Sequence, residues 1–146
     1  MRILFMFLDG VGLGADDPTI NPFALAQMPN LSALLGGKRL LAESAPFCGP
    51  RADLLALDAG LGTPGLPQSA TGQAVLLTGK NIPALLGYHY GPKPNPEVAR
   101  FLGEGGLFGQ FARAGKRAAL LNAYPPGYFS AISSGKRLYS AIPLAV

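Results

Sequence analysis

Apolar residues follow one another without a break at the start of the chain, from Arg2 to Leu8, where the run meets Asp9 and Gly10. A continuous apolar run of this length predicts a central β-strand that is buried on both faces. The stretch KRAALLNAY, residues 116–124, has the same character and predicts a second buried strand. Residues 39–43 and 137–142 carry weaker patterns of the same kind, which predict two further strands.

Helical spacing of apolar residues fills most of the chain between these runs. Asn or Pro precedes several of the segments and Gly follows them, as is usual at helix ends. We therefore expect one or two helices over residues 22–27 and 30–35, and further helices over residues 71–77, 82–87, 96–102 and 107–113. The stretch LLALDAGLG, residues 54–62, fits a helix and a strand equally well.

Strands that alternate with helices predict an α/β fold, here a three-layer sandwich around a mostly parallel sheet. We expect one such domain over residues 1–146. The strand expected over residues 137–142 would then lie at the end of the chain without a neighbour. The pattern therefore predicts the N-terminal part of a longer domain, or a homo-oligomer that forms through the unpaired edge strand.

Composition narrows the function classes. Of the 146 residues, 49% are hydrophobic and 14% charged, which indicates a folded chain rather than a disordered one. The 12 Lys and Arg residues leave a net charge of +4 but stand singly or in pairs, which favours a small anionic substrate over a nucleic acid. Cys48 is the only cysteine, so no intrachain disulfide forms, and the cytoplasm is expected. The run from Arg2 to Leu8 is too short to cross a membrane.

Asp9 stands where the first predicted strand ends. Open α/β sheets bind ligands at the carboxyl ends of their strands, so Asp9 is a candidate metal ligand or catalytic carboxylate. The alternative is that its side chain only caps the turn that follows. Gly10, Gly12 and Ala15 also fit a relaxed dinucleotide-binding pattern. The acidic residues and proline at 16–18 suit neither the helix nor the pyrophosphate that this pattern requires, so a dinucleotide domain is the weakest alternative.

The stretch GLPQSATGQAVLLTGKN, residues 65–81, concentrates polar side chains before an apolar helix. It fits neither a P-loop nor an esterase elbow, because Ala74 and Pro67 stand where these motifs need glycine. Ser69 lies at the expected helix N-terminus, where backbone N–H groups stabilise anions. This favours a nucleophile that attacks a phosphoryl or sulfuryl group after activation by a metal. The alternative is that Ser69 or Thr71 is an ordinary N-cap.

Three segments in order resemble the alkaline phosphatase superfamily, especially the cofactor-independent phosphoglycerate mutases and phosphopentomutases. FLDGVGLG is similar to their opening strand, and NPFALAQMPNLSALL to the helices that follow it. SATGQAVLLTG is similar to their nucleophile segment, in which a Ser or Thr lies three residues before one Gly and ten before another. Ser69, Gly72 and Gly79 have these spacings. The resemblance covers most of residues 1–146.

The resemblance implies a phosphoryl-transfer enzyme, of phosphatase or phosphomutase type, with two divalent metal ions (Mn, Zn or Mg). Asp9 would bind one metal, and Ser69 would bind the same metal and accept the phosphoryl group as phosphoserine. Thr71, Gly72 and Gln73 would contact the substrate. Gln73 replaces the His of the mutases and cannot transfer a proton, so the substrate class stays open.

The superfamily draws its other metal ligands from Asp and His residues, mostly in the C-terminal half. This chain has one His, at position 89, and its only acids after Tyr90 are Glu97 and Glu104. We therefore expect one metal or none to be held by these 146 residues alone. The chain is then either part of a longer metalloenzyme or, as an alternative function, a catalytically silent binding or assembly module derived from that fold.

Overall fold

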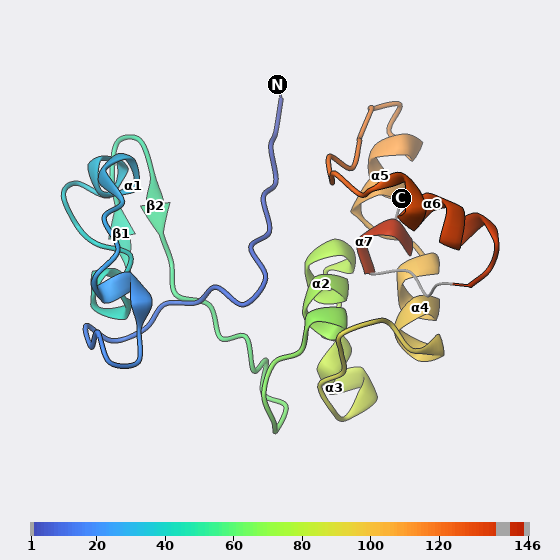
Figure 1. Cartoon of the computed structure of the whole chain (residues 1–146), viewed down its shortest axis with the longest axis horizontal. Coiled ribbons are helices and arrows are strands. Elements are labelled where there is room, and N and C mark those ends of the chain that lie inside the picture. The colour runs from blue at the N-terminus through green and yellow to red at the C-terminus, as the bar shows by residue number, and fades with distance from the viewer. Residues whose placement is uncertain (1, 137–140, 145–146) are drawn as a thin grey trace. The chain divides into compact units, whose positions relative to one another are not determined.

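A computed structural model describes residues 2–136 and 141–144 of the chain. It divides into two compact units, Met1–Asp58 and Ala59–Val146, each with its own packing (Figure 1). Most of the regular structure is helical, and in the described residues the only sheet has two strands. Whether the two units make one domain stays a prediction.

The first unit combines short helical turns with one β-hairpin. Its elements are η1 (Pro22–Ala24), α1 (Pro29–Leu34), η2 (Ala42–Ser44), β1 (Phe47–Cys48) and β2 (Asp53–Leu54). The two strands are antiparallel, with Phe47 opposite Leu54. The buried Asn21 caps η1, since its Oδ1 accepts from the backbone N–H of Phe23 at 3.2 Å. Its Nδ2 donates to Ala15 O at 2.7 Å and so ties the preceding loop to this helical turn.

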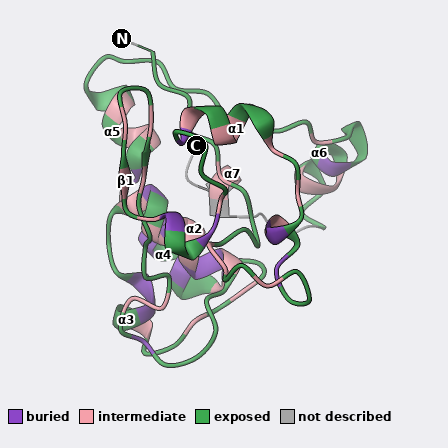
Figure 2. Cartoon of the chain, turned by 90° about the vertical axis from the view of Figure 1, so that its left-hand side faces the viewer, coloured by how far each residue is buried: buried purple, intermediate pink, exposed green. Residues whose placement is uncertain are grey.

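The regular structure of the second unit is helical. Its helices are α2 (Ser69–Thr78), α3 (Ile82–Leu86), α4 (Pro96–Gly103), α5 (Leu107–Arg113), α6 (Pro126–Ser133) and α7 (Ala141–Leu144), and several of them pack around one apolar cluster. The cluster comes from α2, α3 and α4 and comprises Ala74, Leu77, Ile82, Val98, Phe101 and Leu102. Figure 2 shows the buried stretches on these three helices. The packing of α2 against α4 is thus the centre of this unit.

Local signals explain where these helices begin and end. Asn81 and Asn95 cap α3 and α4, because their Oδ1 atoms accept from backbone N–H groups at 3.2 and 2.9 Å. Gly79 ends α2 with φ +70°, and its N–H donates to Val75 O at 2.8 Å. The helices expected over residues 71–77, 82–87, 96–102 and 107–113 are confirmed, with the second ending one residue earlier, at Leu86. The helix expected over 22–27 is only the short 3₁₀ turn η1, whereas the one expected over 30–35 is present as α1, one residue earlier at both ends.

The expected three-layer α/β sandwich with a mostly parallel sheet is wrong. Residues 2–8 form no strand, and in the described part of the chain their backbone has no hydrogen bond to another segment. The apolar side chains of this stretch are exposed except for the half-buried Phe7, and Leu4 is 74% exposed. A strand exists only through hydrogen bonds to a partner strand, and apolar character alone does not supply one.

The other predicted strands fail for the same reason. Residues 116–124 are irregular, and Leu121 is 80% exposed. Residues 39–43 lead into η2 and do not pair with a strand. Residues 137–140 of the last predicted strand lie outside the described residues, whereas 141 and 142 begin α7. Oligomer formation through an unpaired edge strand therefore stays a prediction.

An exposed ionic cluster joins the end of α4 to the end of α2. The Glu104 carboxylate accepts a hydrogen bond from Lys80 Nζ at 2.9 Å and also pairs with Arg100. The hydrogen bond from Lys80 is the main cause that lowers the pKa of Glu104, and partial desolvation opposes it.

Because the pKa of Glu104 is lower in the folded than in the unfolded chain, the cluster stabilises the folded state at pH values above the unfolded pKa. This stabilisation is lost as the pH falls through the folded pKa. We expect Glu104→Gln to flatten the acid limb of the stability curve while changing neutral stability little, because the cluster is exposed. Urea midpoints measured from neutral to acid pH test this. Identical acid limbs for the two proteins would contradict it.

Candidate functional site

Helix α2 presents two different faces, and the predicted nucleophile lies on the more open one. Ala70, Thr71, Ala74 and Leu77 are buried against the rest of the second unit. Ser69, Gly72 and Gln73 are only half-buried. Positions i, i+3 and i+4 lie on the same face of an α-helix, so these three residues share one face over the first two turns. The structure therefore brings together three of the five residues that the sequence singled out.

Ser69 is the first residue of α2. Gln68 precedes it in extended conformation and makes no side-chain capping hydrogen bond. The Gly72 N–H donates to Gln68 O at 2.9 Å, which closes the first turn of the helix. The helix is ten residues long, so its dipole places partial positive charge at the end that carries Ser69. This charge favours an anion beside the Ser69 hydroxyl.

Gly72 has no packing reason to be glycine within the described residues. A Cβ added there would meet nothing within 4 Å, and the residue has ordinary helical geometry. Glycine inside a helix costs about 1 kcal/mol relative to alanine. The missing side chain leaves open space beside Ser69. Gly79, by contrast, is explained by its positive φ at the end of α2.

Gln73 follows Gly72 on the same face. Its Oε1 atom is enclosed, and among the described residues no donor lies within hydrogen-bond distance of it. A buried acceptor without a partner costs about 1–3 kcal/mol. Gln73 is thus the polar group of α2 most in need of a partner.

Thr71 lies on the buried face of α2 and is 0% exposed. Its N–H donates to Tyr90 O at 3.0 Å, and its Oγ1 accepts from the Tyr90 N–H at 3.2 Å. The hydroxyl also lies 3.2 Å from Gln68 O. These contacts engage the Thr71 side chain within the protein, and the substrate contact expected of it stays a prediction.

Asp9 lies in the first unit, in an exposed turn with Gly10 at φ +72°. It follows an extended segment rather than a paired strand, so the sheet edge that was expected to present its carboxylate is not formed. Ser69 belongs to the second unit. A shared metal site for Asp9 and Ser69 therefore stays a prediction.

The glycine-rich loop after Asp9 does not open a helix. The first helical element beyond it is η1, which begins at Pro22, so the context that a dinucleotide site requires is missing. Asp16 pairs with Arg39. Asp17 accepts hydrogen bonds from the hydroxyl and from the backbone N–H of Thr19. Both lower the pKa of Asp17, and the bond from the hydroxyl has the larger effect. Both acids are therefore engaged in holding the loop.

The two divalent cations that the resemblance implies stay a prediction. Within residues 2–136 and 141–144, no three side chains of the His, Cys, Asp and Glu type come together as a metal-ligand group. The imidazole of His89 has its Nε2 3.2 Å from Thr63 O, which is a loop-to-loop contact. Divalent cations need about four donors each. The mechanism considered below therefore has no step that passes through a metal.

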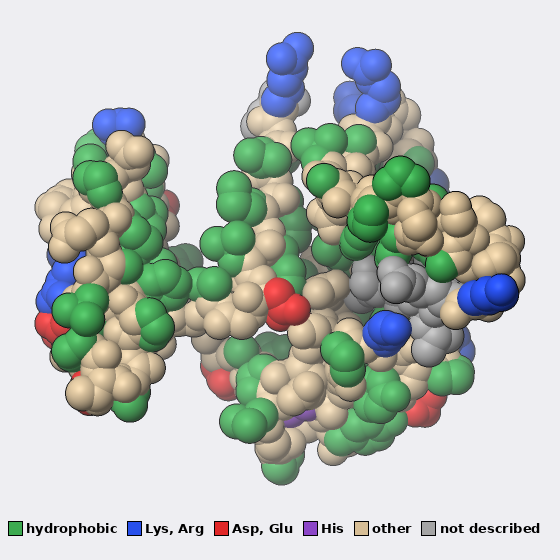
Figure 3. Space-filling view, viewed as in Figure 1, with side chains coloured by type: hydrophobic (Ala, Val, Ile, Leu, Met, Phe, Trp, Pro, Cys, Tyr) green, Lys and Arg blue, Asp and Glu red, His purple; other side chains and the backbone are tan. Residues whose placement is uncertain are grey.

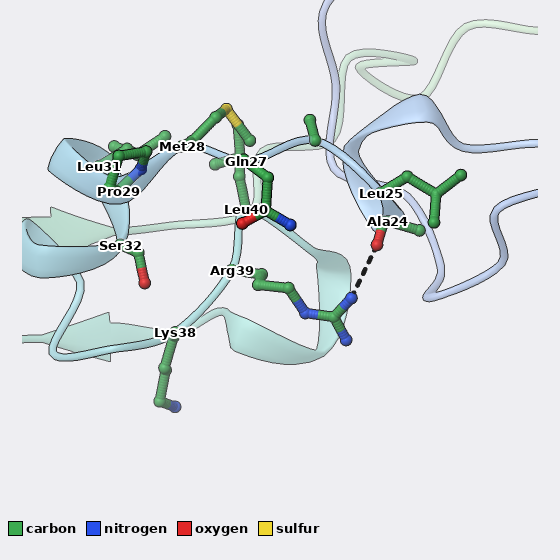
Figure 4. A pocket seen from close by; sticks show the side chains of 11 residues that line it. Ala24, Leu25, Gln27, Met28, Pro29, Leu31, Ser32, Lys38, Arg39 and Leu40 are labelled. Atoms are coloured by element: carbon green, nitrogen blue, oxygen red, sulfur yellow. Dashed lines mark hydrogen bonds between the residues drawn. The ribbon is translucent and has the colours of Figure 1, made fainter.

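A shallow cavity of about 250 Å³ lies in the first unit, and the residues predicted for the site do not line it (Figure 4). It lies between η1, α1 and residues 38–40. The guanidinium of Arg39 is engaged, since its Nη1 donates to Ala24 O at 2.9 Å and it also pairs with Asp16.

Basic side chains are scattered rather than gathered. On the face drawn in Figure 3, Lys and Arg stand singly or in small separate groups. In the described part of the chain, no helix is long and apolar enough to cross a lipid bilayer. Comparison of the chain with known protein families, curated proteins and solved structures found no match.

Proposed function

We propose that the chain takes part in phosphoryl transfer from a small phosphorylated substrate, with Ser69 as the nucleophile. The observation that supports this most is the open face of α2, where Ser69 at the first position is followed one turn later by Gly72 and Gln73. Within the described residues, no packing contact requires glycine at position 72. The ordered resemblance to the alkaline phosphatase superfamily supports the same chemistry.

In the proposed reaction, Ser69 Oγ attacks the phosphorus atom of a phosphate monoester. A bond forms between Oγ and phosphorus while the bond from phosphorus to the ester oxygen breaks. The leaving alkoxide takes up a proton and departs as an alcohol, and the hydroxyl proton of Ser69 passes to solvent. The partial positive charge at the start of α2 stabilises the added negative charge. Metal ions implied by the resemblance would need donors that the described residues do not gather.

The setting proposed for this reaction is the cytoplasm. The single cysteine, Cys48, is a free and exposed thiol, as is usual in a reducing compartment. The net charge of +4 is spread over separate side chains, which suits a small anion better than a nucleic acid. The group that next accepts the phosphoryl group from Ser69 decides whether the reaction is a hydrolysis or a mutase transfer.

A trapping experiment tests the proposal directly. The protein is incubated with p-nitrophenyl phosphate and MnCl₂, quenched in acid and cleaved with trypsin. Cleavage after Arg51 and Lys80 releases a peptide in which Ser69 is the only serine. We expect this peptide to gain the mass of one phosphoryl group, with fragment ions that place it on Ser69. An unmodified peptide under these conditions would instead favour the silent binding module.

A further inference from the structure

The loop between α3 and α4 is bonded to the first turn of α2. Hydrogen bonds join Tyr90 to Thr71, from Thr71 N–H to Tyr90 O at 3.0 Å and from Tyr90 N–H to Thr71 Oγ1 at 3.2 Å, and Thr71 Oγ1 also lies 3.3 Å from Tyr90 O. The two residues are 19 positions apart in the sequence. The Thr71 hydroxyl additionally reaches Gln68 O, which lies just before the helix. One buried side chain therefore connects the loop, the residue before α2 and the helix itself.

Gly91 brings the same loop against the nucleophile. A Cβ added to Gly91 would lie 3.1 Å from the backbone N of Ser69 and 3.1 Å from Gln68 Cβ. Real Cβ atoms rarely approach other heavy atoms this closely, and the backbone N of Ser69 cannot move without moving the helix start. Gly91 has no positive φ, so space rather than backbone conformation explains the glycine.

We propose that Thr71 and Gly91 are positioning residues for Ser69. This rests on the proposed function only in taking Ser69 as the nucleophile. Helix ends fray, and Gln68 supplies no side-chain cap to prevent it here. The hydrogen bonds through Thr71 replace the cap, and the close approach of Gly91 limits where the Ser69 backbone lies. A nucleophile displaced by about 1 Å loses up to about 100-fold in rate, so such a restraint has a measurable consequence.

The role is separable from substrate binding. Thr71 is 0% exposed, and its hydroxyl is engaged by Tyr90 and Gln68. Removing that hydroxyl should therefore change how often Ser69 is correctly placed, and not how tightly the substrate binds. The rate of phosphoryl transfer should fall while KM stays nearly unchanged.

Three threonine variants test this. Thr71→Val removes the hydroxyl at nearly constant shape, and Thr71→Ser keeps it. Thr78→Val removes a hydroxyl at the other end of α2, where it donates to Ala74 O and accepts from the Lys80 N–H. Phosphoryl transfer from p-nitrophenyl phosphate to Ser69 is timed, and hydrogen exchange of the Tyr90 amide is followed by NMR. We expect Thr71→Val to slow transfer about 10- to 100-fold and to speed exchange about tenfold. Thr71→Ser and Thr78→Val should stay within about threefold of the unaltered protein in both measurements.

Gly91→Ala is the second route to the same test, because it disturbs Ser69 while leaving the Thr71 hydroxyl in place. It should slow transfer with KM nearly unchanged, even if Thr71→Val does not fold. Unchanged transfer in both variants, with Ser69 still phosphorylated, would overturn the positioning role and leave the proposed function standing. If Ser69 were not phosphorylated in the unaltered protein, Ser69 would not be the nucleophile. The positioning role would then also be refuted, even if hydrogen exchange were faster in Thr71→Val.

Discussion

Ser69→Ala is expected to abolish phosphoryl transfer, with a loss of about 10³-fold or more in the rate of p-nitrophenyl phosphate turnover. Alanine keeps the helix start of α2 but removes the only atom that bonds to phosphorus in the proposed reaction. Alanine also has the best intrinsic helix propensity, so the fold should be retained. Initial rates with and without MnCl₂, together with the far-UV circular dichroism spectrum, measure the two effects separately.

Two further variants make the Ser69 result specific. Ser69→Thr keeps a hydroxyl at the same helix position and should retain part of the activity. Ser130→Ala removes an exposed hydroxyl that donates only to Pro126 O in α6, and it should leave the rate unchanged. If Ser69→Ala turned over substrate as fast as Ser130→Ala does, another group would have to be the nucleophile.

Leu102→Ala is expected to lower the free energy of unfolding of the helical unit by about 3 kcal/mol. Leu102 lies on α4, is 2% exposed and belongs to the cluster that packs α2 against α4. Truncation to alanine removes apolar contacts and leaves a cavity that its neighbours fill only in part. Urea denaturation followed by circular dichroism measures the change.

Leu85→Ala is the matched control for Leu102→Ala, since it makes the same chemical change on α3 at a side chain that is 59% exposed. It should alter the free energy of unfolding by no more than about 0.5 kcal/mol. Similar losses for the two variants would mean that Leu102 does not lie in the core of this unit. The comparison also tests whether α2, the helix with the predicted nucleophile, packs on α4.

The candidate site was predictable where its signals are local. Ser69, Gly72 and Gln73 are neighbours on one helix, and their spacing alone places them on one face. The contacts of Tyr90 and Gly91 with the start of α2 were not predictable, because nothing in residues 87–92 indicates which helix they touch. A hydrogen bond that spans 19 residues depends on how α3 and α4 pack, which no local pattern encodes.

The sequence by itself determined the helices α2 to α5 of the second unit, whereas α6 was not predicted and α7 begins where a strand was expected. Asn81 and Asn95 cap their helices with their own side chains, and Gly79 ends α2 through a conformation that only glycine adopts cheaply. These interactions span at most four residues, so a local pattern suffices to predict them. The predicted helices over residues 96–102 and 107–113 match α4 and α5 to within one residue for this reason.

Only the tertiary structure decided the strands. The apolar runs at residues 2–8 and 116–124 have the composition of buried strands, yet in the described chain neither pairs with another segment. The short hairpin of β1 and β2 forms instead, where the pattern indicated no strand pair. A strand needs a partner for its backbone hydrogen bonds, and that partner is chosen by contacts between distant segments. Helices satisfy their hydrogen bonds within themselves, and this difference separates what the sequence determined from what it left to the fold.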